Sequence, residues 1–186
     1  MDELERLTRP DGETLALKRV WGSGPTVVWI GGFRSDMEGT KALALARPDR
    51  LAGLVLVNPA PDFTEDLMWP GLADHERQAI LREGETLVVE DGLGPYVLTR
   101  RMFEEARDWL LLRGALPVSA PVHILQGRAD DVVPWRRQIA LVERLTGGDV
   151  RLDLIEGGDH RLSTPADLAR LVDAVERNRR SSSTLS

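Results

Sequence analysis

The sequence contains no cysteine and carries no excess of positive charge. The first absence excludes disulfide bonds, thiolate catalysis and zinc sites built from cysteine. The formal net charge of −6 and the pI near 5.2 argue against a nucleic-acid surface and against docking on anionic lipid. No segment approaches the roughly 18 apolar residues of a membrane span, and residues 1–6 lack the basic start and apolar stretch of a signal peptide. We therefore expect a cytoplasmic protein with no metal, no cofactor, no nucleic-acid partner and no membrane partner.

Apolar runs without polar alternation recur along the chain. They cover residues 26–30, 51–57 and 122–126, and a last strand is expected at 150–155. Such runs are typical of strands buried on both faces of a parallel sheet. Helical patterns separate them, which predicts an α/β fold with helices on both faces of a mostly parallel sheet. At 186 residues the chain is long enough for one such domain, expected over 1–180, with a polar, disordered tail at 181–186.

Local signals place the other elements. Pro10-Asp11-Gly12 is a strong turn signal and predicts a hairpin between residues 4–8 and 14–20. Helices are expected over 36–46, from Pro134 to Gly147-Gly148, and after Thr164 as N-cap. Residues 61–117 break the alternation of strands and helices, because short helical pieces there surround Leu87-Val88-Val89 and apolar side chains are scattered among acids. This segment resembles an inserted lid and is called the lid segment below.

Asp130 follows the predicted strand at 122–126 directly, in the sequence Gly127-Arg128-Ala129-Asp130-Asp131-Val132-Val133-Pro134. Ligands of open α/β sheets bind at the carboxyl ends of the strands, so a carboxylate there can orient a histidine and stabilise its cation. The alternative is that both acids merely cap the helix that begins near Pro134.

His160 is the strongest of the three histidines as a candidate base. His75 lies among charged residues of a predicted helix, and His123 lies within a buried strand, where a core or edge role is favoured over catalysis. His160 alone lies on a glycine-rich loop after a strand, thirty residues after Asp130, in the acid-then-histidine order of α/β-hydrolases. On its own His160 fits a structural role, and the Asp130 motif is what makes it a catalytic candidate.

A third polar loop, Gly31-Gly32-Phe33-Arg34-Ser35-Asp36, follows the first buried strand. Small residues let the backbone approach a ligand, and N–H groups here could form half of an oxyanion hole. A plain strand-to-helix turn capped by Ser35 or Asp36 is an equally good interpretation.

These motifs, taken in order, resemble a known family. The segments that carry the resemblance are residues 31–37, 39–41, 59–64, 125–135 and 158–163. They resemble bacterial α/β-hydrolases, and most closely the group related to the mitochondrial palmitoyl-protein thioesterase and acyl-glucuronide esterase. The resemblance implies the α/β-hydrolase fold, a small acyl ester or thioester as substrate, Asp130 as triad acid and His160 as general base. It further implies oxyanion donors at Phe33 and Gly32 and a lid over an acyl pocket, with Phe63, Met68 and Trp69 as candidate lining residues.

The family's serine nucleophile is the missing feature. No serine of the chain has glycine two positions before and two after, so the G-x-S-x-G turn is absent. Residues 41–46 run straight into Arg47-Pro48-Asp49-Arg50-Leu51, where the family has two strand–helix units, about 60 residues. Neither Ser35, Ser163 nor Asp36 lies on a strained turn that would hold a nucleophile near His160.

Two functions from different classes follow. The chain is a serine-type hydrolase of carboxylic esters or thioesters by descent, with turnover impaired by the missing nucleophile. Alternatively it is a non-catalytic, internally deleted homologue that binds acyl ligands or a protein partner.

Overall fold

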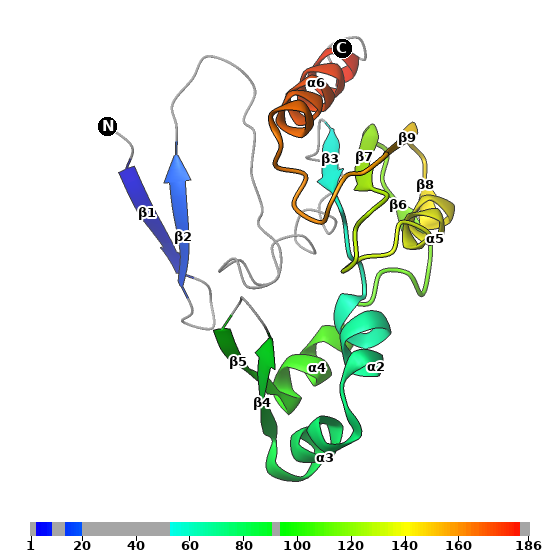
Figure 1. The fold of residues 1–186 in the computed structure, drawn as a ribbon. Coiled ribbons are helices and arrows are strands. Elements are labelled where there is room, and N and C mark those ends of the chain that lie inside the picture. The colour runs from blue at the N-terminus through cyan, green and yellow to red at the C-terminus, as the bar shows by residue number, and fades with distance from the viewer. Residues whose placement is uncertain (1–2, 9–13, 20–52, 91–93, 183–186) are drawn as a thin grey trace. The chain divides into compact units, whose positions relative to one another are not determined.

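The computed structural model describes residues 3–8, 14–19, 53–90 and 94–182. The chain divides into two compact units, Met1–Arg47 and Pro48–Ser186, so the boundary falls inside the predicted join between residues 46 and 51. In the first unit, β1 (Glu3–Thr8) and β2 (Thr14–Arg19) form an antiparallel hairpin, which confirms the predicted one (Figure 1). The strand expected at 26–30 and the helix expected at 36–46 lie outside the described residues.

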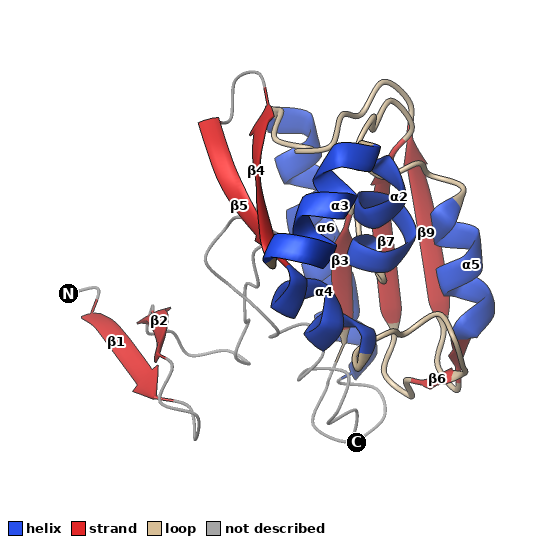
Figure 2. Ribbon diagram, turned by 90° about the horizontal axis from the view of Figure 1, so that it is seen from below, coloured by secondary structure: helices blue, strands red, loops and turns tan. Residues whose placement is uncertain are grey.

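The second unit is built on a parallel sheet. Its strands β3 (Leu54–Val57), β7 (Val122–Gly127) and β9 (Val150–Ile155) lie side by side in the order β3-β7-β9 (Figure 2). All six residues of β7 are buried, as expected of a middle strand covered on both faces. The predicted parallel α/β architecture is therefore confirmed for the described residues, and the carboxyl ends of the three strands lie at one edge.

Helices cover both faces of this sheet. Leu125 packs with Ala174 and Leu171 of α6 (Pro165–Ser182), whereas the side chain of the next residue, Gln126, accepts a hydrogen bond from Gln138 of α5 (Arg137–Arg144). Successive side chains of a strand point to opposite faces. Helices α5 and α6 therefore lie on opposite sides of β7.

Both helices differ from their predicted limits. Residues 134–136 form turns with bonds from Arg137 N–H to Pro134 and from Gln138 N–H to Trp135, so α5 begins after them. Residues Leu145–Thr146 form the short strand β8, which pairs with β6 (Leu116–Pro117). Thr164 caps α6 as expected, through reciprocal hydrogen bonds with Asp167. Helix α6 continues to Ser182, so residues 181–182 of the predicted tail are helical, and 183–186 lie outside the described residues.

The lid segment has an apolar cluster of its own. Its elements, grouped apart from the sheet in Figure 1, are η2 (Thr64–Met68), α2 (Trp69–Gly71), α3 (Asp74–Glu83), β4 (Glu85–Glu90), β5 (Gly94–Thr99) and α4 (Arg100–Arg107). Buried side chains contributed by these elements and their connections pack together: Leu72, Ile80, Val88, Leu98 and Phe103. Leu87-Val88-Val89 lie in the antiparallel hairpin β4–β5, and neither of its strands was predicted.

The lid segment begins with a π-helical turn. Pro70 follows η2 and has no N–H to donate to the carbonyl of Asp66, so an α-helical hydrogen bond is lost there. The N–H of Trp69 instead reaches the carbonyl of Thr64, five residues back.

Ion pairs and backbone bonds tie the start of the lid segment to its end and to α5. The buried carboxylate of Asp62 accepts hydrogen bonds from the N–H groups of Leu111 (2.6 Å) and Leu112 (3.0 Å). Asp66 accepts hydrogen bonds from both terminal nitrogens of Arg113, one at 3.1 Å, and from Nη2 of Arg137 at 3.0 Å. The hydrogen bond from Arg113, aided by that from Arg137, holds the pKa of the Asp66 carboxyl below its ordinary value against the opposing effect of burial.

Replacing Asp66 by asparagine is expected to destabilise the protein in a pH-dependent way. A carboxyl whose pKa is lowered on folding stabilises the fold above its unfolded pKa, near 3.8, and loses that effect as the pH falls through the folded value. At pH 7 we expect the Tm of Asp66→Asn to fall by about 2–4 °C, the shift that ~1 kcal/mol gives in a chain of this size.

Thermal melts between pH 7 and 3 measure this effect. The difference in Tm between the natural chain and the variant should begin to narrow below about pH 4. Glu105→Gln is the control, because Glu105 forms an exposed i,i+4 pair with Arg101, and its Tm should barely change. A gap that stays constant down to pH 3 would contradict the electrostatic explanation.

Candidate active site

Asp130 is held rigidly at the carboxyl end of β7. Its side chain is fully buried, and Oδ1 accepts the N–H groups of Val132 (2.9 Å) and Val133 (2.8 Å). Oδ2 lies 2.9 Å from His160 Nδ1 and 3.4 Å from the side-chain nitrogen of Gln126. The loop therefore fixes one carboxylate oxygen with backbone donors and turns the other toward the histidine.

His160 meets this carboxylate from the loop after β9. An aspartate bonded to Nδ1 favours the tautomer that carries its proton there, which leaves Nε2 as the basic nitrogen. The imidazole is 42% exposed, while the carboxylate behind it has no exposed surface. The pair can thus accept a proton at Nε2 and stabilise the resulting cation from the buried side.

The two loops pack directly against each other. A Cβ at Gly127 would lie 2.3 Å from the carbonyl oxygen of Gly158, so only glycine fits there. The N–H of Ala129 donates to that same carbonyl at 2.9 Å. Gly157 has φ +69°, the left-handed region that glycine favours, and turns the chain from β9 into the histidine loop. These contacts set the separation of the acid and the base.

Buried amide side chains surround the pair, and the sequence patterns did not single them out. Gln126 and Gln138 are fully buried and bonded to each other at 2.7 Å, and Gln138 also donates to the carbonyl of Pro59 at 2.8 Å. Asn58, at the end of β3, bonds to both loops. Glutamine within a buried apolar run was the available signal, because a buried polar group needs a partner.

The other predicted site residues fall into two groups. Gly32 and Phe33 lie outside the described residues. Met68 and Trp69 pack against the cluster inside the lid segment, where the rings of Trp69 and Phe103 meet edge to face with their centroids 4.9 Å apart. Phe63 is the N-cap residue of the π-helical turn. Ser163 is exposed, and among the described residues no serine is hydrogen-bonded to His160.

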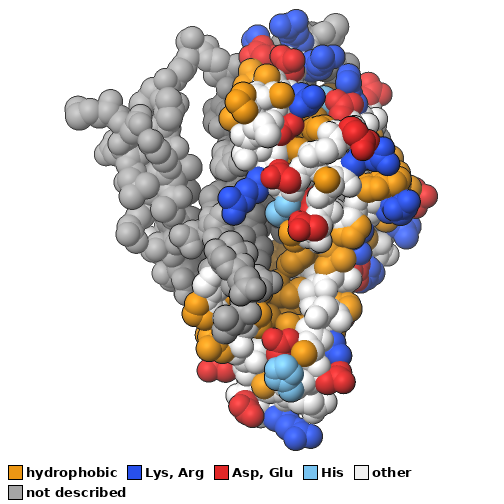
Figure 3. Space-filling model, in the orientation of Figure 1, with side chains coloured by type: hydrophobic (Ala, Val, Ile, Leu, Met, Phe, Trp, Pro, Cys, Tyr) orange, Lys and Arg blue, Asp and Glu red, His pale blue; other side chains and the backbone are white. Residues whose placement is uncertain are grey.

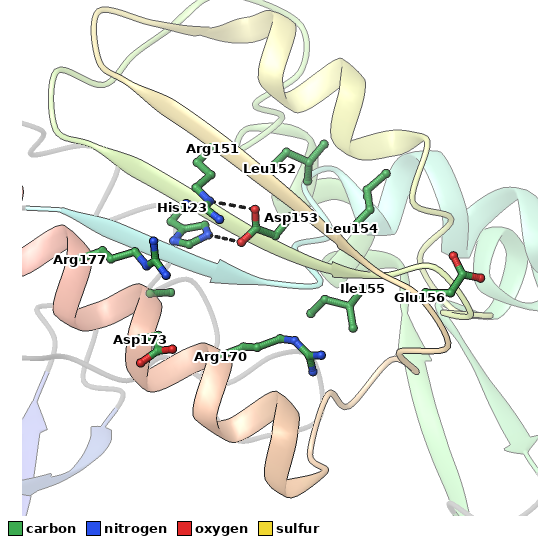
Figure 4. Close-up of a pocket in the computed structure, with 11 residues that line it drawn as sticks. His123, Arg151, Leu152, Asp153, Leu154, Ile155, Glu156, Arg170, Asp173 and Arg177 are labelled. Atoms are coloured by element: carbon green, nitrogen blue, oxygen red, sulfur yellow. Dashed lines mark hydrogen bonds and ion pairs between the residues drawn. The ribbon is translucent and has the colours of Figure 1, made fainter.

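A second histidine–aspartate pair occupies a shallow groove between β9 and α6 (Figure 4). Nε2 of His123 lies 2.9 Å from Oδ2 of Asp153, whose other oxygen is bonded to Arg151 at 2.8 Å. Burial opposes ionisation of Asp153, but the hydrogen bonds from Arg151 and His123 outweigh it and lower the pKa of that carboxyl. The His123 side chain is only 5% exposed. Its ring is thus enclosed between strand and helix, in agreement with the core role predicted for it.

Two further kinds of site could lie in the described part of the chain, an extended charged surface and a group of metal-binding side chains. Figure 3 shows acidic and basic side chains interspersed over one face, with no extended patch of one sign. Among residues 3–8, 14–19, 53–90 and 94–182 no group of three histidine or carboxylate side chains is placed to hold a metal ion. No described helix is both long and apolar enough to cross a membrane.

Curated relatives and solved structures resemble the chain, although no protein-family model matches it. The mitochondrial palmitoyl-protein thioesterase ABHD10 of Bos taurus is 25% identical over 241 residues, which cover 91% of this chain and 78% of the relative. That alignment is longer than the chain's own 186 residues, so it contains residues of the relative that this chain lacks. This is consistent with the predicted internal loss.

Two solved structures share the fold and part of the sequence. A protein from Agrobacterium vitis S4 assigned as a hydrolase superimposes with a TM-score of 0.67 and 38% identity, over 74% of this chain and 57% of the other. Mouse α/β-hydrolase domain-containing protein 10 gives a TM-score of 0.62 and 27% identity, over 73% and 54%. The chain therefore matches just over half the length of these structures. With the parallel sheet and the order of the motifs, these similarities show that the chain belongs to the α/β-hydrolase superfamily.

Proposed function

We propose that this chain carries the acid–base half of a serine-type hydrolase of carboxylic esters or thioesters, and that its own turnover is impaired. The observation that carries the proposal is the 2.9 Å bond between Asp130 and His160 Nδ1 at the strand ends of an α/β-hydrolase sheet. The same order of strand, acid, strand and histidine serves acyl transfer in that fold.

The reaction assigned to the pair is acyl transfer to a serine and then to water. As the serine oxygen bonds to the substrate carbonyl carbon, its proton moves to His160 Nε2, and Asp130 stabilises the imidazolium. The proton then passes to the leaving alkoxide or thiolate as the carbon–oxygen or carbon–sulfur bond breaks. Water then gives a proton to Nε2 as its oxygen bonds to the acyl carbon. The bond from the acyl carbon to the serine oxygen breaks, and the proton on Nε2 returns to that oxygen, which releases the acid and restores the serine. Asp130 and His160 can perform their part, but the serine has no identified counterpart in this chain.

The substrate class follows from the relatives. One of them is named as a palmitoyl-protein thioesterase, which suggests small acyl esters or thioesters for this chain also. By the same resemblance we assign Gly32 and Phe33 as oxyanion donors. Phe63, Met68 and Trp69 are the candidates for acyl contact by that resemblance, and Met68 and Trp69 pack against the apolar cluster of the lid segment.

A non-catalytic, internally deleted homologue is the second candidate. The observation that favours it is the lack, among the described residues, of any serine bonded to His160. Such a protein would bind acyl ligands or a protein partner without turning them over.

Assay of the intact chain with a p-nitrophenyl ester and a fluorophosphonate probe tests the impairment. We expect no serine to be labelled, and the hydrolysis rate to equal that of a His160→Ala variant. The matched control is His75→Ala, which removes an imidazole from a lid helix remote in sequence from both loops. Labelling of a single serine that His160→Ala abolishes and His75→Ala does not would overturn the impairment and identify the nucleophile.

A further inference from the structure

Asn58 joins the carboxyl ends of β3 and β7 to the loop that follows β9. It follows β3 directly, and its side-chain oxygen accepts the N–H of Gly127, the last residue of β7, at 2.8 Å. Its side-chain nitrogen donates to the carbonyls of Asp159 at 3.0 Å and His160 at 2.6 Å, in the loop after β9. The oxygen of one amide group thereby binds the start of the loop that carries Asp130, and its nitrogen binds the loop that carries His160.

The chemistry of these contacts requires an amide. A carboxylate cannot donate to the carbonyls of Asp159 and His160, and a hydroxyl has one proton where two bonds are made. Asn58 is only 5% exposed, so water cannot replace a lost partner without cost. Its φ of +41° lies in the left-handed region, which asparagine tolerates better than most residues with a side chain.

We propose that Asn58 is a positioning residue that sets the orientation of His160 toward Asp130. The bond at 2.6 Å is made to the carbonyl of His160 itself, so it fixes the backbone from which the imidazole extends. The bond to Gly127 fixes the start of the loop that carries Asp130 three residues later. The inference rests on the proposed function, because it assigns Asn58 a part in the acid–base pair.

The pair is preorganised from within the second unit. Every hydrogen bond described for Asp130, His160 and Asn58 comes from residues after Pro48. Within the described residues, contacts inside the second unit are therefore what hold the acid–base geometry. Asn58 can be tested in the intact chain without any turnover.

Nitrogen NMR of histidine-labelled protein reports the tautomer of His160, and the chain has only three histidines to assign. At a pH where His160 is neutral, the proton should be mainly on Nδ1 in the natural chain and should lose that preference in Asp130→Asn. Asn58→Gly removes the side chain and accommodates the positive φ. We expect it to lower the ratio of the Nδ1–H to the Nε2–H form about fivefold, the effect of one hydrogen bond on an equilibrium.

Two further variants separate positioning from general stability. Asn58→Asp keeps the acceptor for Gly127 and loses both donors, so it should also lower the ratio of the Nδ1–H to the Nε2–H form of His160. This variant provides the test if Asn58→Gly folds poorly. Asn178→Ala is the matched control, because Asn178 also donates a side-chain amide, at 2.9 Å, to a carbonyl of β3, but at Leu54, the opposite end of the strand. It should lower the Tm and leave the tautomer ratio unchanged.

The outcomes distinguish the two proposals. If the tautomer ratio of His160 is the same in the natural chain and in Asp130→Asn, both the acid–base pair and the role of Asn58 are overturned. A ratio that depends on Asp130 but not on the Asn58 variants, or that changes equally in Asn178→Ala, would overturn only the role of Asn58.

Discussion

Insertion of a nucleophile segment between Ala46 and Arg47 is expected to turn this chain into an active esterase. The donor is the nucleophile-bearing segment of a complete α/β-hydrolase, selected by its G-x-S-x-G turn. The acid–base pair is already formed without it, so the insert need only present a serine at His160 Nε2. We expect a gain of about 10⁴-fold or more in kcat/KM over the intact chain, because loss of the nucleophile costs ~10⁶ in a complete serine triad.

Hydrolysis of a p-nitrophenyl ester measures the gain, and the same insert with its nucleophilic serine changed to alanine is the control. Fluorophosphonate labelling should map to the inserted serine and to no serine of the original chain. The fold of each chimera is checked by circular dichroism and thermal melting. A folded chimera that stays inactive and unlabelled would mean that Asp130 and His160 are no longer placed for catalysis, and the non-catalytic function would then be favoured.

The sequence predicted the parts of this fold that depend on local pattern. Strands β3 and β7 were predicted because an apolar run without alternation has one common solution, a strand covered on both faces. Strand β9, in which Arg151 and Asp153 alternate with apolar residues, was also predicted, but not from such a run. The pairing of Asp130 with His160 was predictable from their positions after successive strands, since parallel strands end at the same edge.

Features that depend on distant contacts were missed. Asn58 directly follows the strand predicted at 51–57, and no local pattern indicated its role, because its partners Asp159 and His160 lie 101 and 102 residues away in sequence. Helix α5 was predicted from Pro134, but residues 134–136 instead form the turns that place Gln138 beside Gln126. Strand β5 contains Gly94 and Pro95, which lower strand propensity, and it forms because β4 and the lid cluster bury Leu98.

In the chimera with the inserted segment, Asp130→Asn is expected to lower kcat by about 10⁴-fold, as an asparagine in place of the triad acid does elsewhere. The N–H groups of Val132 and Val133 would still hold the amide oxygen, so the loop should keep its shape. The amide nitrogen would then face His160 Nδ1 and donate to it, which moves the imidazole proton to Nε2 and removes the base.

The neighbouring Asp131 is exposed, and Asp131→Asn is therefore the matched control, expected to leave kcat unchanged. Steady-state kinetics with the p-nitrophenyl ester measure both variants. Equal activity of Asp130→Asn and Asp131→Asn would show that the buried carboxylate only shapes the loop, whereas a loss confined to Asp130→Asn, with KM unchanged, would assign it to the stabilisation of the imidazolium.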